Sequence, residues 1–394
     1  MGISATTIFI ALASFLFLYW YSVRNFDYWK KRGVVHSKPV PFFGTTLELL
    51  WKPLNEIEHE RFFQLGRIYG HFEGNRPVLS VADPKVLREI LVKEFPSISS
   101  RRFQNGNVGN PVAESMLPSL GGEDWKRVRS IVSPTFSTGK MRRMISIIKD
   151  CSEVVVNNFK ALCADGKSLD IKRMYGAFAL DAIASSAFST KLDSLNDPEC
   201  DFVKAAKRAF STDYSWRFAL FQLFPNLMKF LRITMFPPEP LEFFKKVTLR
   251  IIEERKRTGQ TRNDFLQLLI DTSKEMFQDQ KLEEGKDDEQ IMSNYNVDDN
   301  TQLPVRNADH KMEERAKRDP YTYLPFGAGP RNCVGMRFAL MEIKVCLSYV
   351  VANFKLLRCS QTKIPLEFHL GPGRLLAKEI FLNVEPRDES ILLK

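Results

Sequence analysis

The chain has 394 residues, 44% of them hydrophobic and 12% aromatic, which is enough to bury one large core or two ordinary ones. Its 57 Lys and Arg outnumber 47 Asp and Glu, giving a net charge of +10. No basic low-complexity tract or nucleic-acid motif accompanies this charge, so we expect no nucleic-acid partner but an acidic protein or anionic lipid. The six cysteines form no CxxC pair, which fits a reducing compartment, and the five scattered histidines argue against a zinc site.

Residues 3–23 contain no charged side chain, and 21 helical residues span about 32 Å, the thickness of a bilayer core. Ala11-Leu12-Ala13 resembles a signal-peptidase site, but no basic region precedes it, so cleavage is disfavoured. Arg24 and the basic residues 30–32 follow the span, which places the bulk of the chain in the cytosol. We therefore predict a single-pass anchor.

Short elements are expected next. Pro39 and Pro41 predict a stiff, extended hinge over residues 38–44. Alternation over residues 67–81, with a turn at Glu73-Gly74-Asn75, predicts a β-hairpin, and Asp83-Pro84 is typical of a helix start.

Residues 124–147 predict a helix on which Trp125 and Arg129 share one face. Spacing alone favours a core tryptophan beside a solvated arginine. Residues 214–244 are crowded with aromatics but broken by prolines, which argues against a second membrane span. This stretch either dips into lipid, lines a substrate entrance or packs in the core. Residues 274–318 are charged and lack apolar periodicity, which predicts a disordered connector.

The most informative segment is residues 326–335, where Cys333 stands between glycines just before a helical apolar pattern over residues 336–350. Free N–H groups at a helix start favour a thiolate, which is a metal ligand or nucleophile. Gly329 and Gly335 let the backbone approach a flat partner, and Arg331 suits a carboxylate on that partner. A structural cysteine and a dinucleotide loop compete, but Asn332 stands where the latter needs its third glycine.

The fixed positions Phe326, Gly329, Arg331, Cys333 and Gly335 fill the pattern Phe-x-x-Gly-x-Arg-x-Cys-x-Gly, which resembles the haem-ligand loop of the cytochrome P450 monooxygenases. The flanking residues 319–325 and 336–340 resemble the microsomal, drug-metabolising branch. The resemblance implies a haem (iron protoporphyrin) cofactor with Cys333 as its thiolate ligand. By the same resemblance, Trp125 and Arg129 contact the haem propionates.

The resemblance also implies a fold that is mainly α with small β sheets, in which residues 363–386 form the closing strands around a turn at Gly371-Pro372-Gly373. Two parts of the family pattern are not found after residue 271: the long haem-crossing helix, with its acidic residue and threonine, and the Glu-x-x-Arg helix. We therefore expect an incomplete P450 fold with an internal deletion whose junction lies close to Met312. No catalytic residue is assigned.

The expected order along the chain is a transmembrane anchor (1–24), a basic and proline-rich hinge (25–45), the first part of a haem-thiolate domain (46–273), a charged linker at the deletion junction (274–318) and the carboxyl-terminal part (319–394). By resemblance the chain is an endoplasmic reticulum protein with its catalytic part in the cytosol. It inserts one oxygen atom from O₂ into a lipophilic small molecule with electrons from an NADPH-dependent reductase. The alternatives are a truncated, inactive isoform and a membrane-tethered interaction protein.

Overall fold

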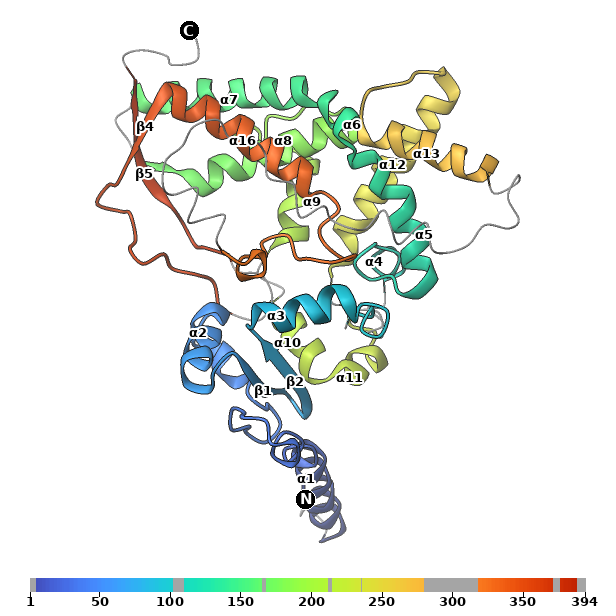
Figure 1. The fold of residues 1–394 in the computed structure, drawn as a ribbon, viewed down its shortest axis with the longest axis vertical. Helices are drawn as coiled ribbons and strands as arrows, with labels where there is room; N and C mark the ends of the chain where they lie inside the picture. Colours follow the sequence, from blue (N-terminus) through green and yellow to red (C-terminus); the bar gives the residue numbers. More distant parts are fainter. Residues whose placement is uncertain are drawn as a thin grey trace.

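The computed structural model describes residues 5–101, 110–164, 168–211, 215–234, 236–279, 318–370 and 376–387. The described part is mainly helical with two small sheets (Figure 1). Gly371-Pro372-Gly373, Met312 and most of the predicted connector lie outside it. The predicted disordered connector began at residue 274, but helix α13 runs to Asp279. The prediction is therefore wrong for residues 274–279, among which Lys, Glu, Met and Gln favour helix.

The amino-terminal part begins with one long apolar helix, the only described helix whose length and composition suit a membrane span. Its elements are α1 (Ala5–Val23), η1 (Lys30–Arg32), η2 (Leu47–Leu50), α2 (Leu54–Leu65), β1 (Ile68–Glu73), β2 (Arg76–Val81), α3 (Pro84–Arg88) and η3 (Glu89–Lys93). The predicted hairpin is confirmed, because β1 and β2 pair antiparallel from Ile68 with Val81 to Glu73 with Arg76. Asp83 caps α3 by accepting from the N–H groups of Lys85 and Val86.

The predicted extended hinge is only partly correct. Val40 and Gly44 exchange two backbone hydrogen bonds of 2.8 Å, so the chain turns back on itself instead of continuing straight. Gly44, at φ +63°, lies so close to the hairpin turn that a Cβ would stand 2.3 Å from the carbonyl oxygen of Gly74. The turn therefore packs flat against the hairpin.

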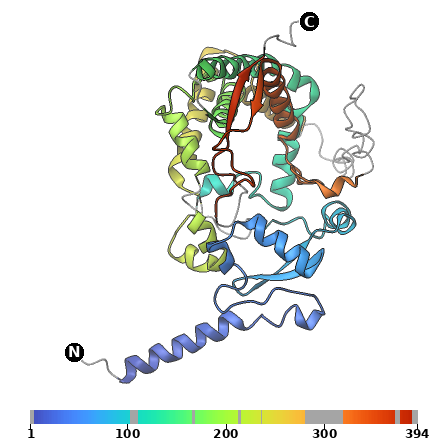
Figure 2. The ribbon, with the colours of Figure 1, turned by 90° about the vertical axis from the view of Figure 1, so that its left-hand side faces the viewer.

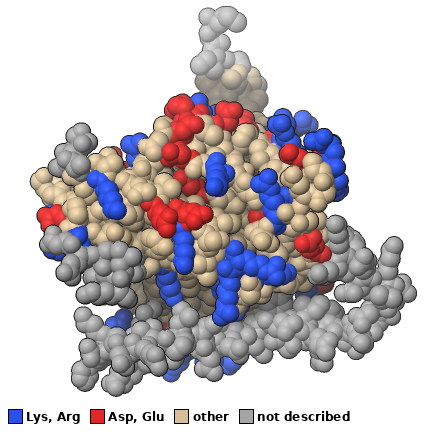
Figure 3. Space-filling model, turned by 90° about the horizontal axis from the view of Figure 1, so that it is seen from above, with Lys and Arg blue, Asp and Glu red and all other residues tan. Residues whose placement is uncertain are grey.

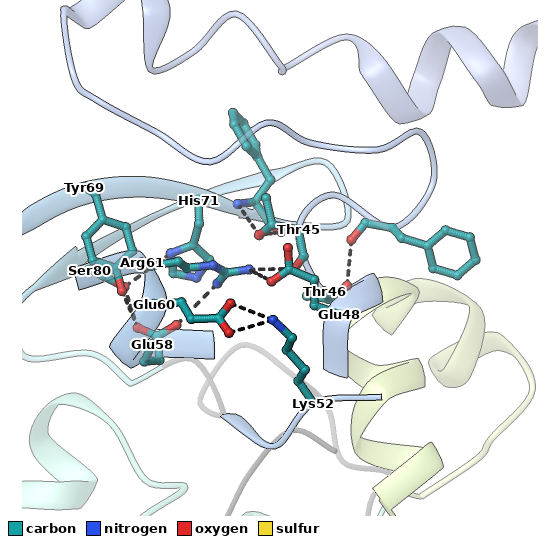
Figure 4. A network of polar contacts seen from close by, with 12 residues as sticks. Thr45, Thr46, Glu48, Lys52, Glu58, Glu60, Arg61, Tyr69, His71 and Ser80 are labelled. Carbon is teal, nitrogen blue, oxygen red and sulfur yellow. Dashed lines mark hydrogen bonds and ion pairs between the residues drawn. The ribbon is translucent and has the colours of Figure 1, made fainter. Parts of the chain in front are cut away.

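A network of polar side chains fastens α2 to this hairpin (Figure 4). Buried Arg61 donates to the carbonyl of Thr45 at 2.8 Å and pairs with Glu58 at 3.3 Å. The Tyr69 hydroxyl donates to the other oxygen of Glu58 at 2.5 Å, and burial together with this carboxylate raises the pKa of Tyr69 to about 12. Arg61 and Glu58 satisfy the Glu-x-x-Arg spacing, but they serve this network at the amino-terminal end of the fold.

The central part is a run of helices. They are α4 (Pro111–Glu114), α5 (Gly122–Val132), η5 (Ser133–Phe136), α6 (Thr138–Arg142), α7 (Ile145–Ala164), α8 (Ile171–Phe188), α9 (Asp201–Phe210), α10 (Ser215–Leu223), α11 (Pro225–Phe230), α12 (Pro238–Thr258) and α13 (Phe265–Asp279). The single helix expected over residues 124–147 is therefore broken, because Pro134 lacks the N–H that would continue α5. Buried Asp264 caps α13 and forms an ion pair with Arg255, which fastens α12 to α13.

The carboxyl-terminal part contains η6 (Pro320–Thr322), α16 (Met336–Asn353), β4 (Phe354–Leu357) and β5 (Phe381–Pro386). The short strand β3 (Leu169–Asp170) joins these in the order β3-β5-β4, so residues far apart in sequence close one sheet. Of the expected closing strands, β5 is present, whereas Phe368 and Ala377 form only an isolated bridge.

The main core lies where α16 packs along α7, with α8 and β5 beside them. Phe159 of α7 is fully buried, and its ring lies 5.5 Å from that of Phe354 at the start of β4. Burying a phenylalanine contributes about 1.5–3 kcal/mol. This core holds α16 in place, and α16 in turn carries the cysteine loop at its amino-terminal end.

The charged side chains on the face above α7 and α16 are mixed in sign, with acidic side chains and uncharged surface among the Lys and Arg (Figure 3). At the opposite end of the molecule α1 projects away from the body, and its carboxyl-terminal end lies beside the β1–β2 hairpin (Figure 2).

Candidate functional site

The cysteine loop, residues 326–335, is closed by its own backbone. The N–H of Cys333 donates to the carbonyl of Phe326 at 2.8 Å, and that of Asn332 donates to Gly329 at 3.0 Å. Gly327 and Gly329 both adopt φ +72°, which side-chain-bearing residues rarely adopt. The loop therefore presents the exposed Cys333 thiol three residues before the first residue of α16.

Gly329 is held against another part of the chain. A Cβ on it would lie 1.9 Å from the carbonyl oxygen of Leu91 in η3, so only glycine fits there. We expected Gly329 and Gly335 to let a flat partner approach the backbone. At Gly329 the backbone of η3 occupies that space instead. Gly335 is less crowded, because its Cβ would lie 3.7 Å from the ring of Phe136.

Arg331 extends from the loop toward α5. Its Nη2 donates to the carbonyl of Leu120 at 2.9 Å, and its guanidinium lies 4.4 Å from the centre of the Trp125 ring. Trp125 is 5% exposed and also contacts Phe95. The Nε of Arg331 is buried and has no hydrogen-bond partner, which is costly unless a further acceptor binds there.

Arg129, one helical turn after Trp125, is 7% exposed and reaches the same loop. Its Nη1 donates to the Asn332 carbonyl at 2.9 Å and its Nη2 to the Asn332 side-chain oxygen at 2.6 Å. The reading of Arg129 as a solvated arginine is therefore wrong. Because it is buried, Arg129 also cannot contribute to an exposed basic surface.

A third arginine completes the site. Arg101 donates through Nη2 to the carbonyl of Arg331 at 2.8 Å. Burial, together with the positive charges of Arg101 and Arg129, lowers the pKa of Arg331 to about 10. No acidic side chain within the described ranges forms an ion pair with Arg331. A bound anion would relieve this repulsion.

These residues fit the haem that the sequence pattern implies. The exposed thiol would serve as the iron ligand, and the three guanidinium groups would suit an anionic group such as a propionate. The partnerless Nε of Arg331 is the sharpest sign of such an anion. The structure thus brings together two segments far apart in the sequence, the cysteine loop and the part of α5 that carries Trp125 and Arg129.

Sequence reasoning missed two members of this site. Arg101 was not predicted as a site residue, although the Arg101-Arg102 doublet in an otherwise uncharged stretch was a signal for an anion. Asn332 was used only to reject a dinucleotide loop, yet it is the residue through which Arg129 holds the cysteine loop. Arg101 acts through a backbone carbonyl, and Asn332 acts through its backbone carbonyl and its side-chain oxygen; no sequence motif encodes these contacts.

Comparison with known proteins agrees with the geometry. The cytochrome P450 family pattern matches residues 35–297 and 306–382. The chain is similar to cytochrome P450 3A12 of Canis lupus familiaris, with 29% identity over 496 aligned positions that cover 98% of each chain. It is also similar to cytochrome P450 3A11 of Mus musculus, with 29% identity over 499 positions (99% of this chain and 98% of the relative). Cytochrome P450 3A6 of Oryctolagus cuniculus is 30% identical over 495 positions, covering 98% of each. The family pattern covers most of the chain, and the chain belongs to the cytochrome P450 family.

Proposed function

We propose that this chain is a membrane-anchored haem-thiolate monooxygenase that inserts one oxygen atom from O₂ into a lipophilic small molecule. Family membership implies a monooxygenase. The observation that carries the proposal is the exposed Cys333 thiol on a loop held by Arg129, beside Arg331 with its partnerless Nε.

The residues divide into two roles. Cys333 would supply the thiolate to the iron, and Trp125, Arg101, Arg129 and Arg331 would hold the propionates. Bound haem supplies the activation of oxygen. Asn332 and the Phe326 carbonyl keep the thiol at a fixed place, because each accepts a hydrogen bond that closes or anchors the loop.

The electrons come from an NADPH-dependent reductase that docks on a basic surface around α5 and α6. Arg142 and Arg143 are exposed there. Arg127 is exposed as well and Lys126 is half-buried, and they pair with Asp124 at 3.2 Å and Glu123 at 2.9 Å. Such surface ion pairs contribute about 0–1 kcal/mol each to stability. The acidic groups of a partner therefore readily replace Glu123 and Asp124 in these pairs.

The proposed location is the endoplasmic reticulum membrane. Helix α1 is about 28 Å long and 6% buried, which suits a bilayer span. Within residues 214–244, Trp216 is 53% and Phe230 is 83% exposed, whereas Phe221 and Met228 are buried against Ala113. This stretch therefore packs into the core on one side and offers an apolar surface to lipid on the other.

A second candidate is a truncated form that binds haem poorly or not at all and does not turn over. The alignment with the dog relative has 496 positions, which exceeds the 394 residues of this chain by 102. This difference supports an internal deletion, and the expected acidic residue and threonine are not found after residue 271. Such a chain keeps the thiolate site but lacks the groups that deliver protons to oxygen.

Reconstitution with a reductase separates the two candidates. The purified chain, loaded with haem in lipid nanodiscs, is given NADPH and a panel of lipophilic amines and steroids. The monooxygenase yields hydroxylated product in step with NADPH consumption. Weak or absent haem uptake, or haem bound through the cysteine with NADPH consumed and no product, points to the truncated form and contradicts the monooxygenase.

A further inference from the structure

The β1–β2 turn, Gly74-Asn75, contacts both the last turn of α1 and the segment that follows this helix. The side-chain amide of Asn75 donates to the carbonyl of Tyr21, in the last turn of α1, at 3.0 Å. The side-chain amide of Asn25, two residues past α1, donates back to the Asn75 carbonyl at 3.0 Å. Helix ends leave such carbonyls without partners inside the helix, so Asn75 acts as a cap on α1.

Aromatic packing reinforces this contact. Trp29 is 7% exposed, and its Nε1 donates to the carbonyl of His71 at 3.1 Å. Its ring lies flat on Gly70, where a Cβ would stand 2.5 Å from the ring atoms. The Phe26 ring lies 5.3 Å from that of fully buried Phe72. The segment after α1 is thus packed into β1 rather than left as a free tether.

The same turn also reaches α10. At Gly74 a Cβ would lie 3.6 Å from the Leu223 side chain, at the carboxyl-terminal end of α10. The apolar patch, defined as Trp216, Leu227, Phe230 and Leu231, is 45–83% exposed and belongs to α10, α11 and the residue after α11. Helices α1, α10 and α11 lie at the same end of the molecule (Figure 1).

We propose that the β1–β2 turn is a rigid junction that sets the angle between the membrane helix and the apolar patch, so that both meet one lipid bilayer. Asn25, Trp29 and Asn75 are its positioning residues. The inference rests on the proposed membrane location and deepens it. It replaces a flexible tether by a fixed orientation of the body on the lipid surface.

The test is a distance distribution between α1 and the patch. Spin labels are attached through unnatural amino acids at positions 12 and 230 of the full chain, which avoids the six cysteines, and the chain is placed in phosphatidylcholine nanodiscs. Pulsed electron resonance is expected to give one narrow distribution. The Asn25→Ala/Asn75→Ala variant is expected to broaden it at least twofold, while Asn196→Ala, which removes an exposed amide bonded only to nearby Asp193, leaves it narrow.

A broad distribution in the unaltered chain, or an unchanged one in the double variant, overturns the junction. Gly70→Ala perturbs the junction independently by displacing the Trp29 ring, so it must broaden the distribution as well. Retention of the chain in membranes after alkaline carbonate washing is scored separately. Loss of retention in the unaltered chain contradicts the membrane location itself, whereas retention with a broad distribution contradicts only the junction.

Discussion

At the scale of single residues, burial decides which charges have a function. Arg129 and Arg127 lie two positions apart on α5, yet Arg129 is buried against the cysteine loop and Arg127 pairs with Asp124 at the surface. Arg129→Ala removes both hydrogen bonds to Asn332, and hydrogen bonds from a charged group contribute about 1.5–3 kcal/mol each. We expect haem affinity, measured by titration of the haem-free chain, to fall at least about tenfold.

The matched control is Arg127→Ala, which alters charge on the same helix without touching the loop. Its haem affinity is expected to stay within about twofold of the unaltered chain. Equal losses in the two variants would show that general charge, and not the contact with Asn332, governs haem binding.

Glu342 is a buried acid two turns into α16. It is 7% exposed, its Oε1 has no hydrogen-bond partner, and burial raises its pKa to about 7. Because this pKa lies above the unfolded value of 4.5, the folded chain loses stability as pH rises through about 4.5 to 7. Glu342→Gln removes the charge. The substitution is expected to raise the free energy of unfolding only slightly at pH 5 and by about 3 kcal/mol at pH 8.

Thermal unfolding of the two chains at both pH values checks this expectation. A shift in Tm that is equal at pH 5 and pH 8 would mean that Glu342 is not the titrating group. Asp181, the buried acid of α8, is left unaltered in both chains; Ser194 donates to it through its backbone N–H at 3.1 Å.

At the scale of elements, close backbone approach places the cysteine loop. Gly329→Ala forces a Cβ against the Leu91 carbonyl at φ +72°, and strain of this kind costs about 1–3 kcal/mol before any clash is counted. The variant is expected to unfold at a Tm several degrees lower, because the loop must leave η3. Gly335→Ala is the control: its Cβ would meet only the Phe136 ring at 3.7 Å, so the Tm of the haem-free chain should hardly change. An equal loss in both variants would contradict the contact with Leu91.

The sequence predicted some of these elements and missed others. The hairpin, the capped helix α3 and helix α16 were predictable because turn residues, caps and apolar spacing are local signals. The break after α5 was missed even though Pro134 marks it, since the helical pattern resumes beyond it. Of the site, Cys333, Arg331, Trp125 and Arg129 followed from a known pattern. The roles of Arg101, Asn332 and Leu91 did not, because they depend on backbone atoms brought together from distant segments.

At the scale of the whole molecule, the apolar surface and the support of the cysteine loop lie in different parts. Helix α1 and the exposed apolar residues of α10 and α11 lie at one end, and the core that supports the cysteine loop lies between α7, α8 and α16. The loop rests on this core through Phe338, whose ring lies 5.3 Å from that of Phe265 at the start of α13. Helix α13 thus joins the support of the site, a role that the sequence alone did not indicate.

The most direct test of the account is the carbon monoxide difference spectrum of the reduced, haem-loaded chain in detergent, recorded beside Cys333→Ala. Thiolate ligation by Cys333 predicts a Soret band near the position typical of haem-thiolate proteins, and its loss in the variant. A band that persists in Cys333→Ala, or a chain that binds no haem while remaining folded, would contradict the assignment of Cys333 as the iron ligand.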